Sequence, residues 1–260
     1  MKTVATIAAS TFGAAGNRTE DTLRILEQMP ADVCLLPGGW FSAGEATANR
    51  LIARLEKRLA DAAGERLICL GVDGRDTVPW ARDQLGVAIT KDGIVGKARK
   101  FHTAPGERGV LAAAQDYRAP EAGLSRIVKH DGFSFYLAIC YDCFGIRQQN
   151  VPNPEVDAVL TSIHGFYPAG QRDSGAAYFA RHGVAGASKA WGVPAFASAR
   201  FYDRPVPERW PTGVLWTSGE RSTTTWTYGE NGIQPQSSRT LQLRCGPCRI
   251  DRYRIRKAVK

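Results

Sequence analysis

The chain has 260 residues, of which 43% are apolar, enough for a sizeable hydrophobic core. No apolar run approaches the roughly 20 residues that a membrane-spanning helix needs, and six cysteines are too few for a disulfide scaffold of this length. The net charge is +9, but residues 239–260 hold eight Lys or Arg against one Asp. The excess is therefore a basic C-terminal segment and not a basic domain.

Buried strands and amphipathic helices alternate at the start of the chain. Near-continuous apolar runs at 3–10, 32–37 and 66–72 predict strands that are covered on both faces. A helix with Thr19 as its N-cap is expected after the first strand. A second helix is predicted at 46–63, with one apolar face that contains Leu51, Ile52, Leu55 and Leu59.

Turn signals then predict two β-hairpins. Lys91-Asp92-Gly93 separates apolar runs at 84–90 and 94–100, and His130-Asp131-Gly132 separates runs at 124–130 and 132–140. Further along we expect a strand at 157–163, a helix at 175–191, and strands at 195–199, 241–244 and 249–255. No repeat or linker interrupts the pattern, so we predict a single mixed α/β domain over residues 1–260, with helices covering the sheet faces.

Four predicted strands end in segments that carry reactive or unusual residues. These segments are LLPGGWF around Gly38, GKARKFH around Lys100, LAICYDCFG around Cys140 and VLTSIHGFYP around His164. Reactive groups of α/β sheets gather outside the carboxyl ends of the strands. We therefore expect Gly38, Lys100, Cys140 and His164 to converge in one pocket.

Two of these segments resemble motifs of the nitrilase superfamily, the carbon–nitrogen hydrolases. They are KDGIVGKARKFH and AICYDCFG, in the family's order and about 40 residues apart, and the resemblance extends over residues 2–218. It implies a four-layer α-β-β-α sandwich, a homodimer, and hydrolysis of an amide, nitrile or carbamoyl group through a thioester or thioimidate. It implies neither a metal nor a cofactor. A cytoplasmic location is expected because the apolar stretch at residues 3–10 is interpreted as a buried strand and not as a signal peptide.

The same resemblance assigns roles to residues. Cys140 is the expected nucleophile, Lys100 the cation that stabilises the oxyanion, and the Tyr141 amide the second oxyanion donor. Glu107 matches the second glutamate of the family, which orients the site. Asp142 and Phe144 are expected to fix the turn and to pack.

The family's first glutamate, the general base, is absent because Pro37-Gly38 stands where the family has Pro-Glu. Loss of a general base removes about 10²–10⁴ of the rate. Three explanations remain open: Glu45 takes its place, Glu107 acts as the sole base, or the protein has lost hydrolysis and binds a small molecule or a protein partner. In the last case, Gly38→Glu should restore activity.

Several other residues have alternative interpretations. Trp40 either fills the space left by the missing glutamate or stacks on a planar substrate, and His164 and Phe166 either line the pocket or pack in the core. Cys245 and Cys248 are expected to flank a hairpin turn built on Gly246-Pro247 rather than to bind a metal. The basic segment at 239–260 is interpreted as a solvated edge strand with a charged terminus, and alternatively as a contact to nucleic acid.

Overall fold

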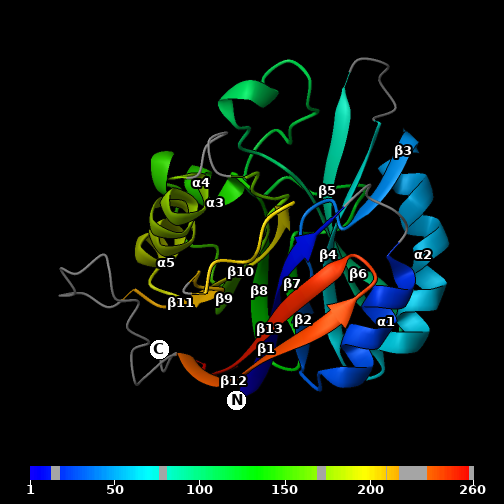
Figure 1. The fold of residues 1–260 in the computed structure, drawn as a ribbon. Helices are drawn as coiled ribbons and strands as arrows, with labels where there is room; N and C mark the ends of the chain where they lie inside the picture. The colour runs from blue at the N-terminus through cyan, green and yellow to red at the C-terminus, as the bar shows by residue number, and fades with distance from the viewer. Residues whose placement is uncertain (13–17, 76–80, 169–173, 209, 217–232, 258–260) are drawn as a thin grey trace.

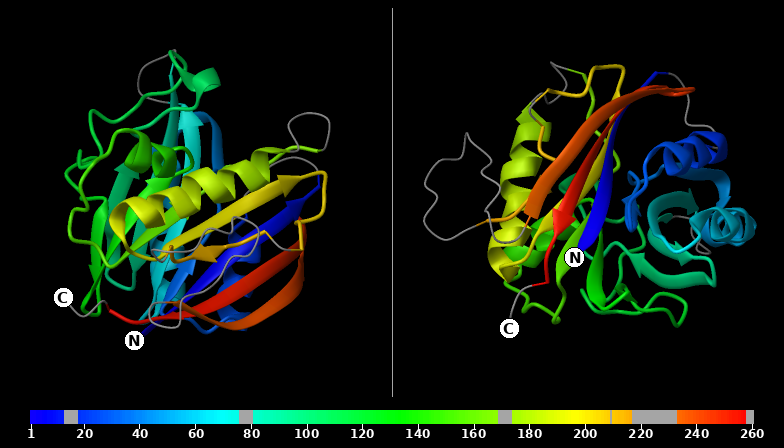
Figure 2. Two further views of the ribbon diagram at one scale, coloured as in Figure 1. Left: turned by 90° about the vertical axis from the view of Figure 1, so that its left-hand side faces the viewer. Right: turned by 90° about the horizontal axis from the view of Figure 1, so that it is seen from below.

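The computed structural model describes residues 1–12, 18–75, 81–168, 174–208, 210–216 and 233–257. Two layers of strands lie face to face between two layers of helices (Figures 1 and 2). The predicted four-layer α-β-β-α sandwich is confirmed.

The first strand layer is built around the N-terminal strand. Its order is β6-β5-β4-β2-β1, in which β1, β2 and β4 are parallel and β5 and β6 form the first predicted hairpin. The bounds are β1 (Lys2–Thr11), β2 (Val33–Leu35), β4 (Leu67–Arg75), β5 (Arg82–Thr90) and β6 (Gly93–Arg99).

The second strand layer starts from the same strand. β1 pairs with β2 through Val4–Thr6 and with β10 through Ala8–Thr11, and β10 continues into β9, β8 and β7. The bounds are β7 (Ile127–His130), β8 (Phe133–Ile139), β9 (Ala158–Ser162), β10 (Ala195–Tyr202) and the short β11 (Gly213–Val214).

Alternation of side chains explains the layering. Val33 and Leu35 of β2 belong to the core cluster that also holds β8 and β9, whereas Cys34 and Leu36 belong to a cluster with the helices. Helices α1 (Thr19–Gln28) and α2 (Ala48–Ala63) cover the first layer, and α3 (Asp142–Gln148), α4 (Ser174–Tyr178) and α5 (Ala185–Trp191) cover the second (Figure 1).

Two local predictions were wrong. Thr19 is the first helical residue of α1, and Arg18 occupies the cap position without a capping side-chain hydrogen bond. Residues 41–47 form a strand, β3 (Phe41–Thr47), so that α2 starts only at Ala48, where the Thr47 hydroxyl accepts a hydrogen bond from the Arg50 amide. Pairing with β4 supplies the stability that this half-exposed segment lacks alone.

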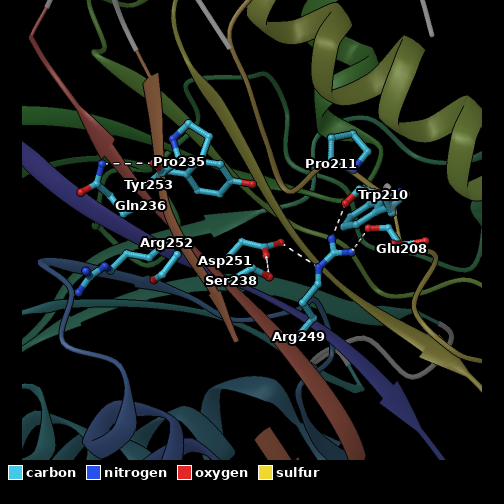
Figure 3. Close-up of a pocket in the computed structure, with 11 residues that line it drawn as sticks. Glu208, Trp210, Pro211, Pro235, Gln236, Ser238, Arg249, Asp251, Arg252 and Tyr253 are labelled. Carbon is cyan, nitrogen blue, oxygen red and sulfur yellow. Dashed lines mark hydrogen bonds and ion pairs between the residues drawn. The ribbon is translucent and has the colours of Figure 1, made fainter. Parts of the chain in front are cut away.

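The basic segment is mostly sheet. β12 (Ile233–Leu243) is an edge strand as predicted, but β13 (Gly246–Ile255) lies between β12 and β1. Because Leu243 pairs with Gly246, the turn consists of Arg244 and Cys245, and Gly246-Pro247 already belongs to β13. The Arg249 side chain donates hydrogen bonds to the Asp251 carboxylate and the Glu208 carbonyl (Figure 3). It also donates to the Pro207 carbonyl, so its charge stabilises the fold.

Candidate active site

The four predicted strand-end residues meet at one end of the sandwich. Gly38 follows β2, Lys100 follows β6, Cys140 follows β8, and His164 follows β9. The charges of Lys100 and His164 both act on Cys140, and Gly38 touches His164. The convergence expected from the sequence is therefore present.

Cys140 stands on a tight strand-to-helix turn. Its φ is +49°, in the left-handed region, which a residue other than glycine adopts at a cost of about 1–3 kcal/mol. The Cys140 amide donates to the Ser162 carbonyl at 2.9 Å. Only 9% of the residue is exposed, so the thiol lies just inside the surface.

Asp142 ties this turn to the lysine segment. Its fully buried carboxylate accepts hydrogen bonds from the amides of Phe101 (2.8 Å), His102 (3.0 Å) and Ile139 (3.1 Å), and it pairs with Arg126. The turn-fixing role predicted for Asp142 is thus visible in its contacts.

Lys100 is fully buried beside the thiol. Its Nζ donates to Glu107 Oε2 at 2.5 Å and to Gln84 Oε1 at 2.9 Å. Burial lowers the pKa of Lys100, but the charges of Cys140 and Glu107 outweigh burial, so the pKa is raised and the side chain stays a cation.

Neither alternative carboxylate is placed to act as the base. Burial raises the pKa of Glu107, but the Lys100 charge, the Lys100 hydrogen bond and the Ala104 amide together lower it, so Glu107 is held as a carboxylate that faces the lysine. Glu45 lies at the surface in an ion pair with Arg75 at 2.8 Å.

His164 fills the space of the missing glutamate. A Cβ atom at position 38 would lie 2.9 Å from the ring nitrogen Nδ1 of His164. It would also lie 2.8 Å from the main-chain nitrogen of His164 and 2.8 Å from the main-chain carbonyl oxygen of Ser162. Two of these three atoms are main chain and cannot move aside. Position 38 therefore requires glycine, and Gly38→Glu would displace the imidazole instead of restoring a site.

Asp73 fixes the orientation of His164. Asp73 Oδ1 lies 2.8 Å from His164 Nε2, which leaves Nδ1 as the nitrogen available to Cys140. Nδ1 is buried and has no hydrogen-bond partner of ordinary geometry among the described residues, yet the ring lies close enough to Cys140 for each group to shift the pKa of the other. Such contacts commonly tighten only when substrate binds.

The electrostatics of this group favour a thiolate–imidazolium pair. Burial raises the pKa of Cys140, but the charges of Lys100 and His164 outweigh it, so the pKa is lowered. Burial lowers the pKa of His164, but Asp73 and Cys140 outweigh it and raise the pKa to about 9. Cys143, one helical turn on, has no such neighbours, and burial raises its pKa.

The other predicted residues lie around this group. Tyr141 stacks on Phe144, with its ring 5.7 Å from Lys100 Nζ. Phe166 packs against aromatic rings of the core, which are Phe179, Phe201 and Trp210. Trp40 is fully buried in the helix-side core and donates to the Thr22 hydroxyl, so the residue that fills the space beside Gly38 is His164 and not Trp40.

Sequence reasoning missed Asp73 and Gln84. Asp73 lies near the carboxyl end of β4 in LGVDGR, and the rule that selected the other strand ends applies equally to it. Gln84 lies near the start of β5, which is antiparallel to β4 and so brings its start to the same edge. Asp73, which bonds His164, and Gln84, which bonds Lys100, both line a hollow of about 250 Å³.

A larger cavity, of about 410 Å³, lies elsewhere, between the β12–β13 hairpin and residues 208–211 (Figure 3). Its central carboxylate, Asp251, is bonded by Thr212, Ser238 and Arg249. Within the described part of the chain no cluster of His, Cys, Asp and Glu has a metal-binding arrangement, and no helix is long and apolar enough to cross a bilayer.

Solved structures share this fold. A carbon–nitrogen hydrolase from Helicobacter pylori G27 aligns with 76% of this chain and 73% of its own, at a TM-score of 0.56 and 15% identity. A CN-hydrolase superfamily protein from Xanthomonas campestris covers 76% of both chains at a TM-score of 0.55 and 17% identity. Nit3 from Saccharomyces cerevisiae, a member of branch 10 of the nitrilase superfamily, covers 82% of both chains at a TM-score of 0.52 and 13% identity.

No protein-family model matches the sequence, and no curated protein matches it significantly. The likeness at these identities is one of fold. The chain has the carbon–nitrogen hydrolase fold, as its motifs predicted.

Proposed function

We propose that this protein is a cysteine-dependent hydrolase of a carbon–nitrogen bond, in which His164, oriented by Asp73, replaces the glutamate base of the fold. One observation carries the proposal. The imidazole of His164 occupies the space that a side chain at position 38 would need, beside the cysteine and within hydrogen-bond reach of a carboxylate.

The residues support a complete acyl transfer. The Cys140 thiolate attacks the carbonyl carbon of an amide, and the developing oxyanion is stabilised by Lys100 and by the Tyr141 amide. The His164 imidazolium gives its proton to the leaving nitrogen as the C–N bond breaks, which releases an amine and leaves a thioester on Cys140. Neutral His164 then takes a proton from water, whose oxygen attacks the thioester and releases a carboxylic acid.

Asp73 and Glu107 act as positioning residues in this scheme. The Asp73 carboxylate keeps His164 in one tautomer and stabilises its imidazolium form. Glu107 and Gln84 hold the Lys100 ammonium in place.

The pH dependence of Cys140 alkylation tests this function. A model thiol has a pKa of about 8.5 and loses about tenfold in reactivity per pH unit below it, because only the thiolate reacts. Since Lys100 and His164 lower the pKa of Cys140, its alkylation by iodoacetamide should level off at a lower pH than that of a model thiol, and it should lose less than tenfold per pH unit just below pH 8.5. The rate is measured by mass spectrometry of the labelled peptide.

Cys143 serves as an internal control in the same peptide. It is fully buried with a raised pKa, so it should stay unlabelled over the whole range. A Cys140 rate that climbs tenfold per pH unit from pH 6 to pH 8.5, as in a model thiol, would contradict the proposed function.

A further inference from the structure

One buried arginine contacts His164, and a second buried arginine lies near the first. Arg18, just before α1, is 6% exposed, and Arg200, on β10, is 4% exposed. Arg200 Nε donates to the His164 carbonyl at 3.1 Å, so the main chain of His164 contacts Arg200 while its ring faces Cys140. The two cations lie close together, because Arg18 contacts the ring of Trp40 and Arg200 lies against the adjacent Gly39, and the charge of Arg18 adds to burial in lowering the pKa of Arg200.

Neither guanidinium has all of its donors satisfied. Arg18 Nε and Arg200 Nη1 are buried and have no hydrogen-bond partner among the described residues. The Arg18 guanidinium lies 5.0 Å from the Trp40 ring and that of Arg200 lies 4.8 Å from the Tyr202 ring, but an aromatic face accepts charge without accepting these N–H groups. Buried charged donors without an acceptor are rare in folded proteins because their desolvation is uncompensated.

Within the described part of the chain, neither arginine has a counter-ion of its own. No described carboxylate forms an ion pair with either arginine, and Asp73, whose charge acts on Arg200, is already bonded to His164. Gly39 lies against both groups, since a Cβ there would lie 2.4 Å from Asp73 Oδ2 and 2.9 Å from Arg200 Nη2, and position 39 therefore has no room for a side chain. The described residues therefore place two cations and two unused N–H donors here, and the nearby carboxylate, Asp73, is already paired with His164.

We propose that Arg18 and Arg200 bind a carboxylate of the substrate. Two N–H donors on two guanidinium groups match the two oxygens of a carboxylate. The inference rests on the proposed function and narrows it: the substrate is an amide that carries a carboxylate near the bond that breaks, because Arg200 contacts His164, whose charge acts on the thiol.

Two alkylating reagents test the assignment. Iodoacetate carries a carboxylate and iodoacetamide does not. The rate of Cys140 alkylation by iodoacetate divided by the rate with iodoacetamide therefore reports binding at the anion site. We expect this ratio to fall about tenfold in Arg18→Gln and in Arg200→Gln, because each removes one charged hydrogen bond to the reagent. Lys100 attracts iodoacetate equally in the wild type and in both variants, so its charge does not change the ratio. Arg54→Gln, on the exposed face of α2, removes one positive charge elsewhere and is the control that should keep the wild-type ratio.

Thermal unfolding with added anions gives a second readout. Sodium succinate should raise the Tm of the wild type above that in sodium chloride of equal ionic strength, and Arg18→Gln should abolish the increase even where Arg200→Gln does not fold. An unchanged alkylation ratio in folded variants, or stabilisation by chloride or inorganic phosphate at least equal to that by succinate, would overturn the carboxylate assignment.

The two proposals fail in different ways. If neither reagent labels Cys140 faster than a model thiol, the hydrolase proposal fails, whereas a succinate effect that is lost in Arg18→Gln still supports the anion site. If iodoacetamide labels Cys140 rapidly and the ratio is insensitive to both arginines, the anion site fails and the hydrolase proposal stands.

Discussion

His164→Gln should reduce acyl transfer to Cys140 by about 10²–10⁴-fold, the usual contribution of a general acid–base. Glutamine keeps a polar side chain of similar reach but carries no transferable proton, so Cys140 loses the imidazolium whose charge lowers its pKa. The leaving nitrogen also loses its proton donor. The measurement is the pre-steady-state release of p-nitrophenol from p-nitrophenyl acetate, an activated acyl donor that requires no knowledge of the natural substrate.

Two further variants separate catalysis from structure. His102→Gln is the matched control, because the His102 amide bonds Asp142 while its ring lies against Gln149, and it should react like the wild type. Asp73→Asn keeps a hydrogen-bonding partner for His164 but removes the charge that raises its pKa, so the loss of activity at high pH should move to lower pH. A His164→Gln protein that acylates at the wild-type rate would disprove the assignment of the base.

Lys100→Met should destabilise the protein by about 3–5 kcal/mol, the cost of breaking a buried ion pair by removing one partner. Lys100 is fully buried, and its loss leaves the Glu107 carboxylate without a cation. The same change should raise the pKa of Cys140, because Lys100 is the largest influence that opposes burial there. Urea denaturation measures the free energy of unfolding, and alkylation against pH measures the thiol.

The double variant Lys100→Met/Glu107→Gln distinguishes the two effects. Removing the charge of Glu107 as well should recover much of the lost stability, while the reactivity of Cys140 at pH 7 stays low. Recovery of both would mean that Lys100 acts on the thiol only through folding, and a wild-type alkylation profile in Lys100→Met would contradict its electrostatic role.

The sequence predicted the parts of this site that depend on local patterns. Lys100 and Cys140 each follow a strand whose apolar periodicity is plain, and Asp142 follows within the same turn, so their position at one sheet edge could be derived. The four layers were implied by the resemblance of the motifs, whereas the near-continuous apolar runs predicted only strands that are covered on both faces.

The parts that the sequence did not predict depend on contacts between distant segments. The space beside Gly38 is enclosed by the main chain of Ser162 and His164, and no local pattern shows that an imidazole fills it. Asp73 and His164 lie 91 residues apart in the chain and meet only through the order of the strands. From the sequence, a glycine at position 38 indicates only that the base is missing. In the structure, the same glycine leaves the space that the His164 imidazole occupies.

The most direct measurement of this account is the ultraviolet absorbance of the Cys140 thiolate as a function of pH, taken as the difference between the wild type and Cys140→Ser. The account predicts a thiolate that is already present at pH 7 and that His164→Gln diminishes at the same pH. A difference signal that emerges only near the ordinary thiol pKa of about 8.5, equally in wild type and His164→Gln, would contradict it.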